Sequence, residues 1–532
     1  MSTARKIISN TLAQIIGKLL VTIIGLATVK MTTHYLSVKG YGEYTAVYEF
    51  LAFFGIAADL GFFTIGVKEM SQNEEKIPII IGNILSLRTI SVIFTMIVAV
   101  VLGFLIPKYQ GTRIPLGIAI SSLTVFYTIM NGTITSVLQV KMKMHLASIA
   151  TIAGKIITVL FMAYVIFYGY PDDKETGFNM LMAAGVIGCA AMHYGTNYFV
   201  RKITPLKHRF DIAIWKELIT KSLPYGIALI LSTIYFRMNS ILISLLRNQE
   251  ELGIYGVASK LLEQFTIIPL YFMNSVLPVL AKSIKHATKS RSEPQGEQNK
   301  HSENLDSTEA IIKYKTIIRY SFDFLAAMSA PMVVGAYILA YPIIFIISTP
   351  EFMSRLNEGF YGSDIALKIL IFALLFQFIN ILFAFILIAA NKQGKLLYIN
   401  GACVILNITI NLFLIPRYGF VGACITYVFS EFFILVAVAM TARRCVEFSL
   451  NFKNLLKIFF CAGIMGATVY FLQPFTYKYL QNWNVFLLAA LGGAIYVAML
   501  FATKVVDKDM LKLIRRGEDT PEPSDISSTK NL

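Results

Sequence analysis

The feature that most constrains this chain is the recurrence of apolar stretches about 20 residues long, each enough for one membrane-spanning helix, between Asn10 and Phe501. Only 15% of the 532 residues are charged, whereas a soluble domain carries about 25% charged residues. Lipid offers the backbone no hydrogen-bonding partner, so segments that cross it repeatedly must be helical or form a closed barrel, and stretches of this length indicate helices. The sequence therefore predicts an all-α integral membrane protein.

We expect about fourteen spanning helices, from windows of about 20 apolar residues. The first is too long for the apolar core of a signal peptide and lacks an A-x-A-like cleavage site, so we interpret it as a membrane helix. The predicted segments are 10–35, 44–67, 79–106, 114–138, 146–168, 178–200, 218–246, 253–281, 316–347, 363–391, 394–416, 419–442, 454–473 and 484–503.

Lys and Arg are unevenly distributed among the predicted loops. With the N-terminus inside, they concentrate in the termini and in the loops after even-numbered segments, with the strongest clusters at 201–216 and 282–291. Such a bias marks the cytoplasmic side. We therefore expect a multi-pass protein of the cytoplasmic membrane with both termini in the cytoplasm. This orientation accounts for the net charge of +16, and no short loop offers the basic folded surface that a nucleic-acid partner needs.

Two polar stretches interrupt this pattern. Residues 282–315 form a long insert rich in Ser, Glu, Gln, Lys and His, and residues 511–532 form a polar tail. Both are too hydrophilic to bury a core. We expect a cytoplasmic linker and a disordered cytoplasmic tail.

A short internal echo suggests duplicated halves. Gly42–Ala46 begins one even-numbered segment after a short outer loop, and Gly253–Val257 begins another in the same setting, six segments later. Transporters are often built from such repeats. We expect two parallel six-helix lobes, 1–215 and 216–445, followed by an added helix pair at 446–510.

Two stretches of the sequence resemble a known family. The run LNITINLFLIPRYGFVGACI at 406–425, and the combination of Thr32–Gly42, Tyr44 and Ala58–Phe62, are similar to Wzx-type O-antigen and oligosaccharide flippases. These belong to the superfamily that also holds multidrug exporters and lipid II flippases. The resemblance implies two six-helix lobes around a central cavity, lined mainly by the segments 10–35, 44–67, 218–246 and 253–281.

Cations inside the predicted spans are the main candidates for a substrate site, because an ionisable side chain in hydrocarbon usually faces a wet cavity or a partner. Several share a helix face with polar residues, and Arg and Lys bind phosphate oxygens well. This pattern favours an anionic (pyro)phosphate headgroup. For Arg88, helix packing is an equally good interpretation, and polar side chains here can also bond neighbouring helices. The candidates for substrate binding are Gln14, Lys18, Arg88, Arg237, Lys260 and Gln264.

Acidic residues inside the spans are fewer, which suggests a cavity with excess positive charge. Glu49 and Glu263 are candidates for carrying a coupling proton. Asp59 is at least as well explained by packing or gating and is left out of the site. Along single helix faces, Arg319 is expected to pair with Asp323, and Lys260 can pair with Glu263 in the same way, as neighbours three or four residues apart on a helix can.

The sequence predicts a transporter with no catalytic residues, metal or cofactor. The five cysteines have neither disulfide nor metal-binding spacing, and no phosphate-binding G-x-x-x-x-G-K-[ST] loop occurs. We expect a secondary carrier that flips a polyprenyl-(pyro)phosphate-linked oligosaccharide by alternating access. Its partners would be the lipid-linked oligosaccharide and membrane lipid, with a glycan polymerase and glycosyltransferases acting on the same glycan.

Three alternatives remain at this point. A multidrug or cation exporter of the same superfamily needs an acidic, aromatic cavity, against which Lys18 and Arg237 argue. A lipid II-type precursor flippase would share fold and mechanism. A membrane glycosyltransferase or polymerase needs carboxylates on a large outer loop, whereas the longest predicted outer loop, 349–362, is short.

Overall fold

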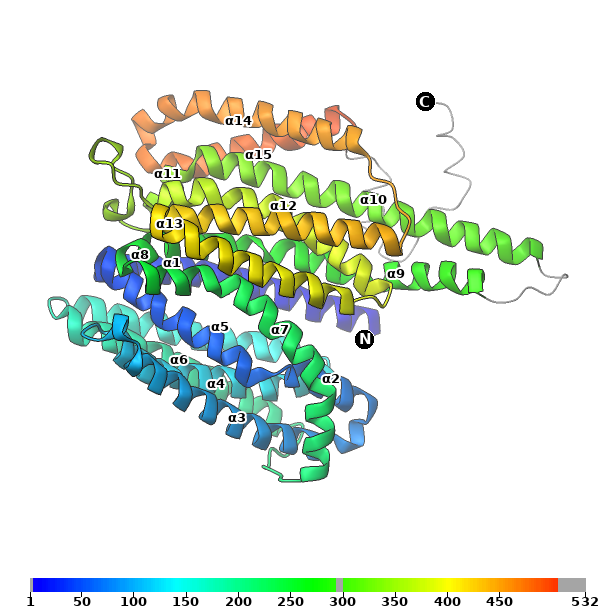
Figure 1. Cartoon of the computed structure of the whole chain (residues 1–532), viewed down its shortest axis with the longest axis horizontal. Helices are drawn as coiled ribbons and strands as arrows, with labels where there is room; N and C mark the ends of the chain where they lie inside the picture. The colour runs from blue at the N-terminus through cyan, green and yellow to red at the C-terminus, as the bar shows by residue number, and fades with distance from the viewer. Residues whose placement is uncertain (1–2, 293–299, 506–532) are drawn as a thin grey trace. The chain divides into compact units, whose positions relative to one another are not determined.

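The structure, a computed structural model, is helical throughout the part of the chain that it describes (Figure 1). It describes the backbone of residues 3–292 and 300–505, with side chains except at 3–16, 286–309 and a few positions of 224–236. In these ranges there is no strand, only an isolated bridge between Arg355 and Phe360. The α-helices are α1 (Thr3–Asp59), α2 (Phe62–Gln72), α3 (Ile77–Leu105), α4 (Ile114–Val140), α5 (Met144–Tyr164), α6 (Lys174–Arg201), α7 (Ile212–Leu246), α8 (Gln249–Phe265), α9 (Ile267–Ser292), α10 (Lys300–Ile338), α11 (Ala340–Ile347), α12 (Ser363–Ala389), α13 (Gly394–Cys445), α14 (Phe452–Leu480) and α15 (Asn484–Ala502).

The two longest helices are each broken once. α1 has 57 residues and α13 has 52, which at 1.5 Å per residue is more than twice the roughly 30 Å of a bilayer core. α1 breaks at Ser37 (φ 60°) and α13 at Gly419 (φ 59°), and these breaks separate segments that the sequence predicts as distinct. Ten helical stretches of the described residues are long and apolar enough to cross a membrane; the total of fourteen spans stays a prediction.

Three predicted segments are interrupted: 253–281 by a turn at Thr266 between α8 and α9, 316–347 by a turn at Leu339 between α10 and α11, and 44–67. The sequence predicts a continuous helix over 44–67, but α1 ends at Asp59 and α2 begins at Phe62. Leu60 (φ 44°) and Gly61 (φ 76°) between them are left-handed, a conformation that ends a helix and that glycine adopts readily. The Asp59-Leu60-Gly61 motif is therefore a helix break.

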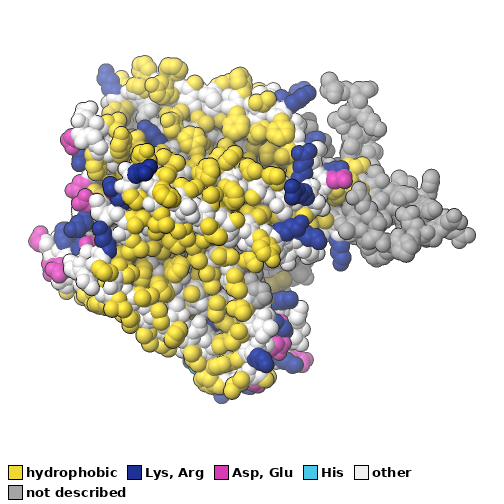
Figure 2. All heavy atoms as spheres, in the orientation of Figure 1, with side chains coloured by type: hydrophobic (Ala, Val, Ile, Leu, Met, Phe, Trp, Pro, Cys, Tyr) yellow, Lys and Arg dark blue, Asp and Glu magenta, His cyan; other side chains and the backbone are white. Residues whose placement is uncertain are grey.

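The molecular surface is that of an integral multi-pass membrane protein. Figure 2 shows apolar side chains over most of the visible face and charged side chains gathered toward its edges. Large apolar side chains such as Phe94, Leu160 and Phe471 are more than 60% exposed. Soluble proteins rarely expose such continuous apolar surface, whereas lipid tails solvate it.

The described chain forms two compact units. The first holds the chain up to Gln264 together with Ile344–Ala366 and Asn400–Ser430, and the second holds Phe265–Ile343, Leu367–Ile399 and the described residues from Glu431 on. In the first, α3, α4, α5 and α6 pack side by side (Figure 1). The lobe boundaries predicted from the sequence stay a prediction.

The second unit has its own core between α10, α14 and α15. Small side chains of α10, among them Ala326 and Ala330, pack against Cys461 and Met465 of α14. The Tyr496 hydroxyl donates to the Ala327 carbonyl at 2.9 Å. Small residues let membrane helices approach closely, so the predicted pair 446–510 is attached to α10 by close packing.

The two glycines of the internal echo meet each other. A Cβ on Gly42 would lie 1.6 Å from the Gln249 carbonyl oxygen, and one on Gly253 would lie 2.3 Å from the Val38 carbonyl oxygen. Only glycine permits α1 and α8 to approach this closely. The close packing of α1 against α8 in the first unit therefore explains why both copies of the echo begin with glycine.

The polar insert differs from the expected linker. α9 continues to Ser292 and α10 begins at Lys300, so helix extends into it from both sides. A polar sequence can stay helical without burying a core, because Lys, Glu and Gln are good helix formers. Residues 293–299 and the tail 511–532 lie outside the described residues.

Candidate functional site

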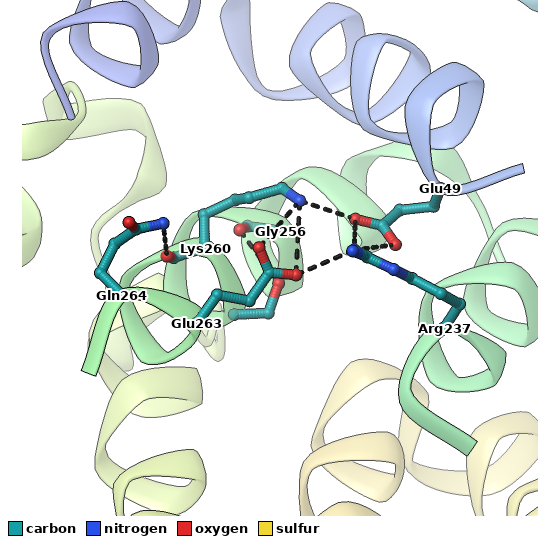
Figure 3. Close-up of polar contacts among 7 residues, drawn as sticks. Glu49, Arg237, Gly256, Lys260, Glu263 and Gln264 are labelled. Carbon is teal, nitrogen blue, oxygen red and sulfur yellow. Dashed lines mark hydrogen bonds and ion pairs between the residues drawn. The ribbon is translucent and has the colours of Figure 1, made fainter. Parts of the chain in front are cut away.

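Four charged side chains from three helices form a closed cluster in the first unit (Figure 3). We call Glu49 of α1, Arg237 of α7, and Lys260 and Glu263 of α8 the charge ring. Arg237 Nη1 donates to both Glu49 oxygens at 2.9 and 2.8 Å, and to Glu263 Oε1 at 2.8 Å. Lys260 Nζ donates to Glu49 Oε1 at 2.9 Å and lies 3.3 Å from Glu263 Oε2. Each cation therefore contacts both carboxylates.

The helices position the ring in two different ways. Lys260 and Glu263 are i,i+3 neighbours on α8, a spacing that puts both on one face. Glu49 is 188 residues from Arg237 and 211 from Lys260, so only the tertiary fold brings it in. The Glu49 side chain is also the most enclosed of the four, at 5% exposed.

Aromatic and hydroxyl groups line the space beside the ring. A cavity of about 10 Å³ lies among Glu49, Arg237, Ser240, Tyr255 and Glu263, with Ser259, Leu262 and Tyr427 completing its wall. Such a volume holds about one water molecule. The ring is thus filled by its own side chains.

The ring carries two positive and two negative side chains and is formally neutral. The sequence suggests excess positive charge, because it shows the number of cations but not their partners. A buried cation is strongly destabilising unless it is paired, and here the carboxylates of Glu49 and Glu263 provide that pairing.

Gln264 lies one turn beyond Lys260 and contacts α1. Its Nε2 donates to the Lys260 carbonyl at 3.4 Å, and Thr22 Oγ1 donates to its Oε1 at 3.1 Å. Lys18, one turn before Thr22, is half-buried and forms no ion pair with the acidic side chains that the structure describes. The Gln14 side chain lies outside the described residues. The structure therefore connects Gln264 to the ring and leaves Lys18 apart from it.

Arg88 lies in a separate ion pair. The Arg88 guanidinium contacts Asp59, and its Nη1 donates to Thr133 Oγ1 at 2.8 Å. The side chain is 3% exposed and joins the end of α1 to α3 and α4. This placement supports the packing interpretation that the sequence left open for Arg88.

The expected pair of Arg319 and Asp323 is wrong. Asp323 is buried and accepts from Asn454 Nδ2 at 2.8 Å, while Arg319 is exposed and lies over the Tyr320 ring. Spacing on α10 permits the pair, but the start of α14 provides a competing donor. Only the packing of α14 on α10 decides this.

Sequence reasoning missed two polar features of the first unit. Lys30 on α1 donates from Nζ to the carbonyls of Phe345 and Ser348, near the end of α11. Asn411 Nδ2 donates to Asn239 of α7 and to Asn407 at 2.6 and 2.9 Å. The signal for Lys30 was present, since it is a cation within the segment 10–35. The asparagine network joins α7 to α13 across 172 residues and has no local signal.

A family model for polysaccharide biosynthesis proteins matches residues 4–284, which include all four residues of the charge ring. The chain belongs to the polysaccharide biosynthesis protein family. This match confirms the family resemblance found in the sequence, and no curated protein sequence matches the chain.

Solved structures show the same fold. A structure titled lipid II flippase MurJ, inward closed conformation, has a TM-score of 0.64 at 14% identity, over 94% of this chain and 100% of that one. An inward-facing multidrug resistance MATE family transporter of the MOP superfamily has 0.56 at 14%, over 81% and 97%. A mutant of the Vibrio cholerae MATE transporter VcmN has 0.51 at 12%, over 83% and 97%. This member of the polysaccharide biosynthesis protein family therefore has the fold of membrane transporters.

Proposed function

We propose that this family member is a secondary transporter that flips a polyprenyl-(pyro)phosphate-linked oligosaccharide from the inner to the outer leaflet of the cytoplasmic membrane, for cell-surface polysaccharide. The observation that carries the proposal is the charge ring: Arg237 and Lys260 converge within spanning helices. Paired cations are the groups that bind a phosphate or pyrophosphate strongly. The family match supports a glycan as the cargo.

In this proposal the headgroup binds at Arg237 and Lys260, with Gln264 and Thr22 beside them to hydrogen-bond sugar or phosphate oxygens. Lys18 and Gln14, further along α1, would extend the site. Glu49 and Glu263 couple transport to protons. The two predicted lobes would rock around the ring, exposing it to each side in turn.

A direct test reconstitutes the purified chain in proteoliposomes with a fluorescent short-chain polyprenyl pyrophosphate-linked oligosaccharide. The proposal expects the label to become accessible to an impermeant reagent on the far leaflet faster than in protein-free vesicles. A matched control is Lys221→Gln, which removes an exposed cation of α7 that pairs with Glu69 and Glu217 outside the ring. Equal rates with and without wild-type protein would refute the proposal.

Two other functions remain as candidates, each with a supporting observation. A lipid II-type precursor flippase is favoured by the fold shared with the lipid II flippase MurJ, and would differ in the group that the polyprenyl pyrophosphate carries. A multidrug or cation exporter is favoured by the two ring carboxylates beside Tyr255 and Tyr427, because carboxylates and aromatic faces bind organic cations. Offering a lipid II analogue and an organic cation dye in the same vesicles separates the three.

A further inference from the structure

The ring cations are already bound to anions of the chain itself. Glu49 accepts three hydrogen bonds, two from Arg237 Nη1 and one from Lys260 Nζ, all at 2.8 to 2.9 Å. A carboxylate and a phosphate present the same kind of charged oxygen acceptor to Arg and Lys. The adjoining cavity of about 10 Å³ has room for about one water. A phosphate can take over the hydrogen bonds that Arg237 Nη1 and Lys260 Nζ donate to Glu49 only if this carboxylate moves away.

Glu49 is the carboxylate that can leave. Glu263 shares α8 with Lys260, three residues away, so the two stay close however the helices move. Glu49 comes from α1, and its contacts with α7 and α8 are made only by tertiary packing. Movement of α1 relative to α7 and α8 therefore separates Glu49 from both cations at once.

We infer that Glu49 is an internal competitor for the anionic headgroup: it occupies the cations of the charge ring until the headgroup phosphate displaces it, and its release frees α1 from α7 and α8. The inference rests on the proposed function. It assigns Glu49 a positioning role, because the residue leaves when the substrate arrives. It also explains why a site for an anion holds two carboxylates.

Displacement has a consequence for protons. The Glu49 side chain is 5% exposed, and an ionised carboxylate without a cation is strongly unfavourable in such a place. The displaced Glu49 therefore takes one proton from water and becomes a neutral acid, while the phosphate takes over its hydrogen bonds. Binding of the headgroup is then accompanied by uptake of one proton.

Other groups facing Glu49 do not provide this proton site. On α7 and α8 these are Arg237, Lys260 and Glu263, and Glu263 keeps both cations as partners after the exchange. The other titratable groups nearby are the phenols of Tyr41 on α1 and of Tyr255 and Tyr427 beside the cavity. An ordinary phenol loses its proton near pH 10, above the range tested. The proton uptake therefore reports on Glu49.

The test measures binding of a short-chain polyprenyl pyrophosphate sugar diester to the purified full-length chain in nanodiscs between pH 5.5 and 8.5. Both phosphates of this probe remain ionised across the range. Since the complex binds one proton more than the free protein, it becomes less stable as the pH is raised, and the Kd is expected to rise up to about tenfold for each unit of increase in pH. Calorimetry in two buffers of different ionisation enthalpy should show close to one proton taken up.

Glu49→Gln removes the competing charge and the proton site together. It should bind the probe about tenfold or more tightly than wild type at pH 8, with a Kd independent of pH. The matched control is Glu43→Gln, on the same helix, where the carboxylate pairs with Arg113 at 2.6 Å outside the ring. That variant should keep the wild-type pH dependence.

A wild-type Kd that does not change with pH, or weaker binding by Glu49→Gln, overturns the inference while the proposed function stands. Absence of probe binding by wild type at every pH overturns the proposed function and the inference with it. If Glu49→Gln fails to fold, proton uptake by the wild-type protein decides alone.

Discussion

The charge ring and the Arg88–Asp59 pair are both ionic sites between helices of the first unit, yet they are built differently. In the pair, one guanidinium meets one carboxylate, and the Thr133 hydroxyl takes a further hydrogen bond. In the ring, each of two cations is shared between two carboxylates. A shared cation can exchange one partner while it keeps the other, whereas Arg88 would lose its counter-ion altogether. The comparison indicates a fixed joint at Arg88 and an exchangeable site at Arg237.

The largest expected effect is on transport through the ring. Arg237→Ala and Arg237→Glu should abolish flipping without loss of folded protein, and Arg237→Lys should retain part of it, because charge is kept but the planar fork is lost. Lys260→Ala and Lys18→Ala should likewise abolish flipping without loss of folded protein. The measurement is surface glycan in a flippase-deficient strain, with protein levels matched by immunoblot.

Normal complementation by all three alanine variants, at Lys18, Arg237 and Lys260, would make these cations packing residues. The charge ring would then be a structural ion-pair site, like the Arg88–Asp59 pair, and would have no role in binding the substrate.

Breaking the Arg88–Asp59 pair should lower the stability of the protein rather than its transport rate. Asp59→Ala leaves the Arg88 guanidinium, 3% exposed, without its counter-ion, and breaking a buried pair in this way costs about 3–5 kcal/mol. We expect a lower unfolding temperature and less monodisperse protein, with near-normal flipping per folded molecule.

The double variant Asp59→Ala with Arg88→Met should recover part of that stability, since no buried charge is left unpaired. If Asp59→Ala instead folds normally and loses flipping, Arg88 belongs with the transport site and the contrast with the ring is wrong.

A smaller effect is expected at Gln264, which touches Lys260 and Thr22 through single hydrogen bonds of 3.4 and 3.1 Å. Gln264→Ala should weaken probe binding several-fold, as the loss of about 1 kcal/mol implies. Gln393→Ala, at the start of α13, serves as a control for loss of an amide elsewhere. Equal affinity in both variants would remove Gln264 from the site.

The smallest effect is expected at the insert. Replacing residues 286–309 by a Gly and Ser linker of equal length should leave surface glycan unchanged, because the composition of 282–315 cannot form a core. Loss of glycan at normal protein levels would show that the insert does more than link.

The same segment tests the proposed topology. A single cysteine introduced by Ser302→Cys should resist an impermeant thiol reagent in intact cells and react after permeabilisation, as the Lys and Arg bias predicts. Labelling in intact cells would reverse the orientation.

The sequence by itself determined where helices form. Apolar length is sufficient for this, because backbone groups in lipid have no partner outside their own helix. It also placed Lys260 and Glu263 on one face, since their spacing is local. The break at Ser37 was foreseen only as a gap between the predicted segments 10–35 and 44–67. The interruptions at Leu60 and Gly61, at Thr266 and at Leu339 were missed.

Only the tertiary structure decided which charges meet. Glu49 reaches Arg237 across 188 residues, and Asp323 prefers Asn454 to the nearby Arg319. Both outcomes depend on how helices pack, and a buried charge accepts whichever partner the packing brings within hydrogen-bonding distance, because leaving it unpaired costs more than any local preference can offset. Spacing along a helix records only the neighbours at three and four residues. The sequence could therefore name the ionisable residues of the ring but not their neutral, closed arrangement.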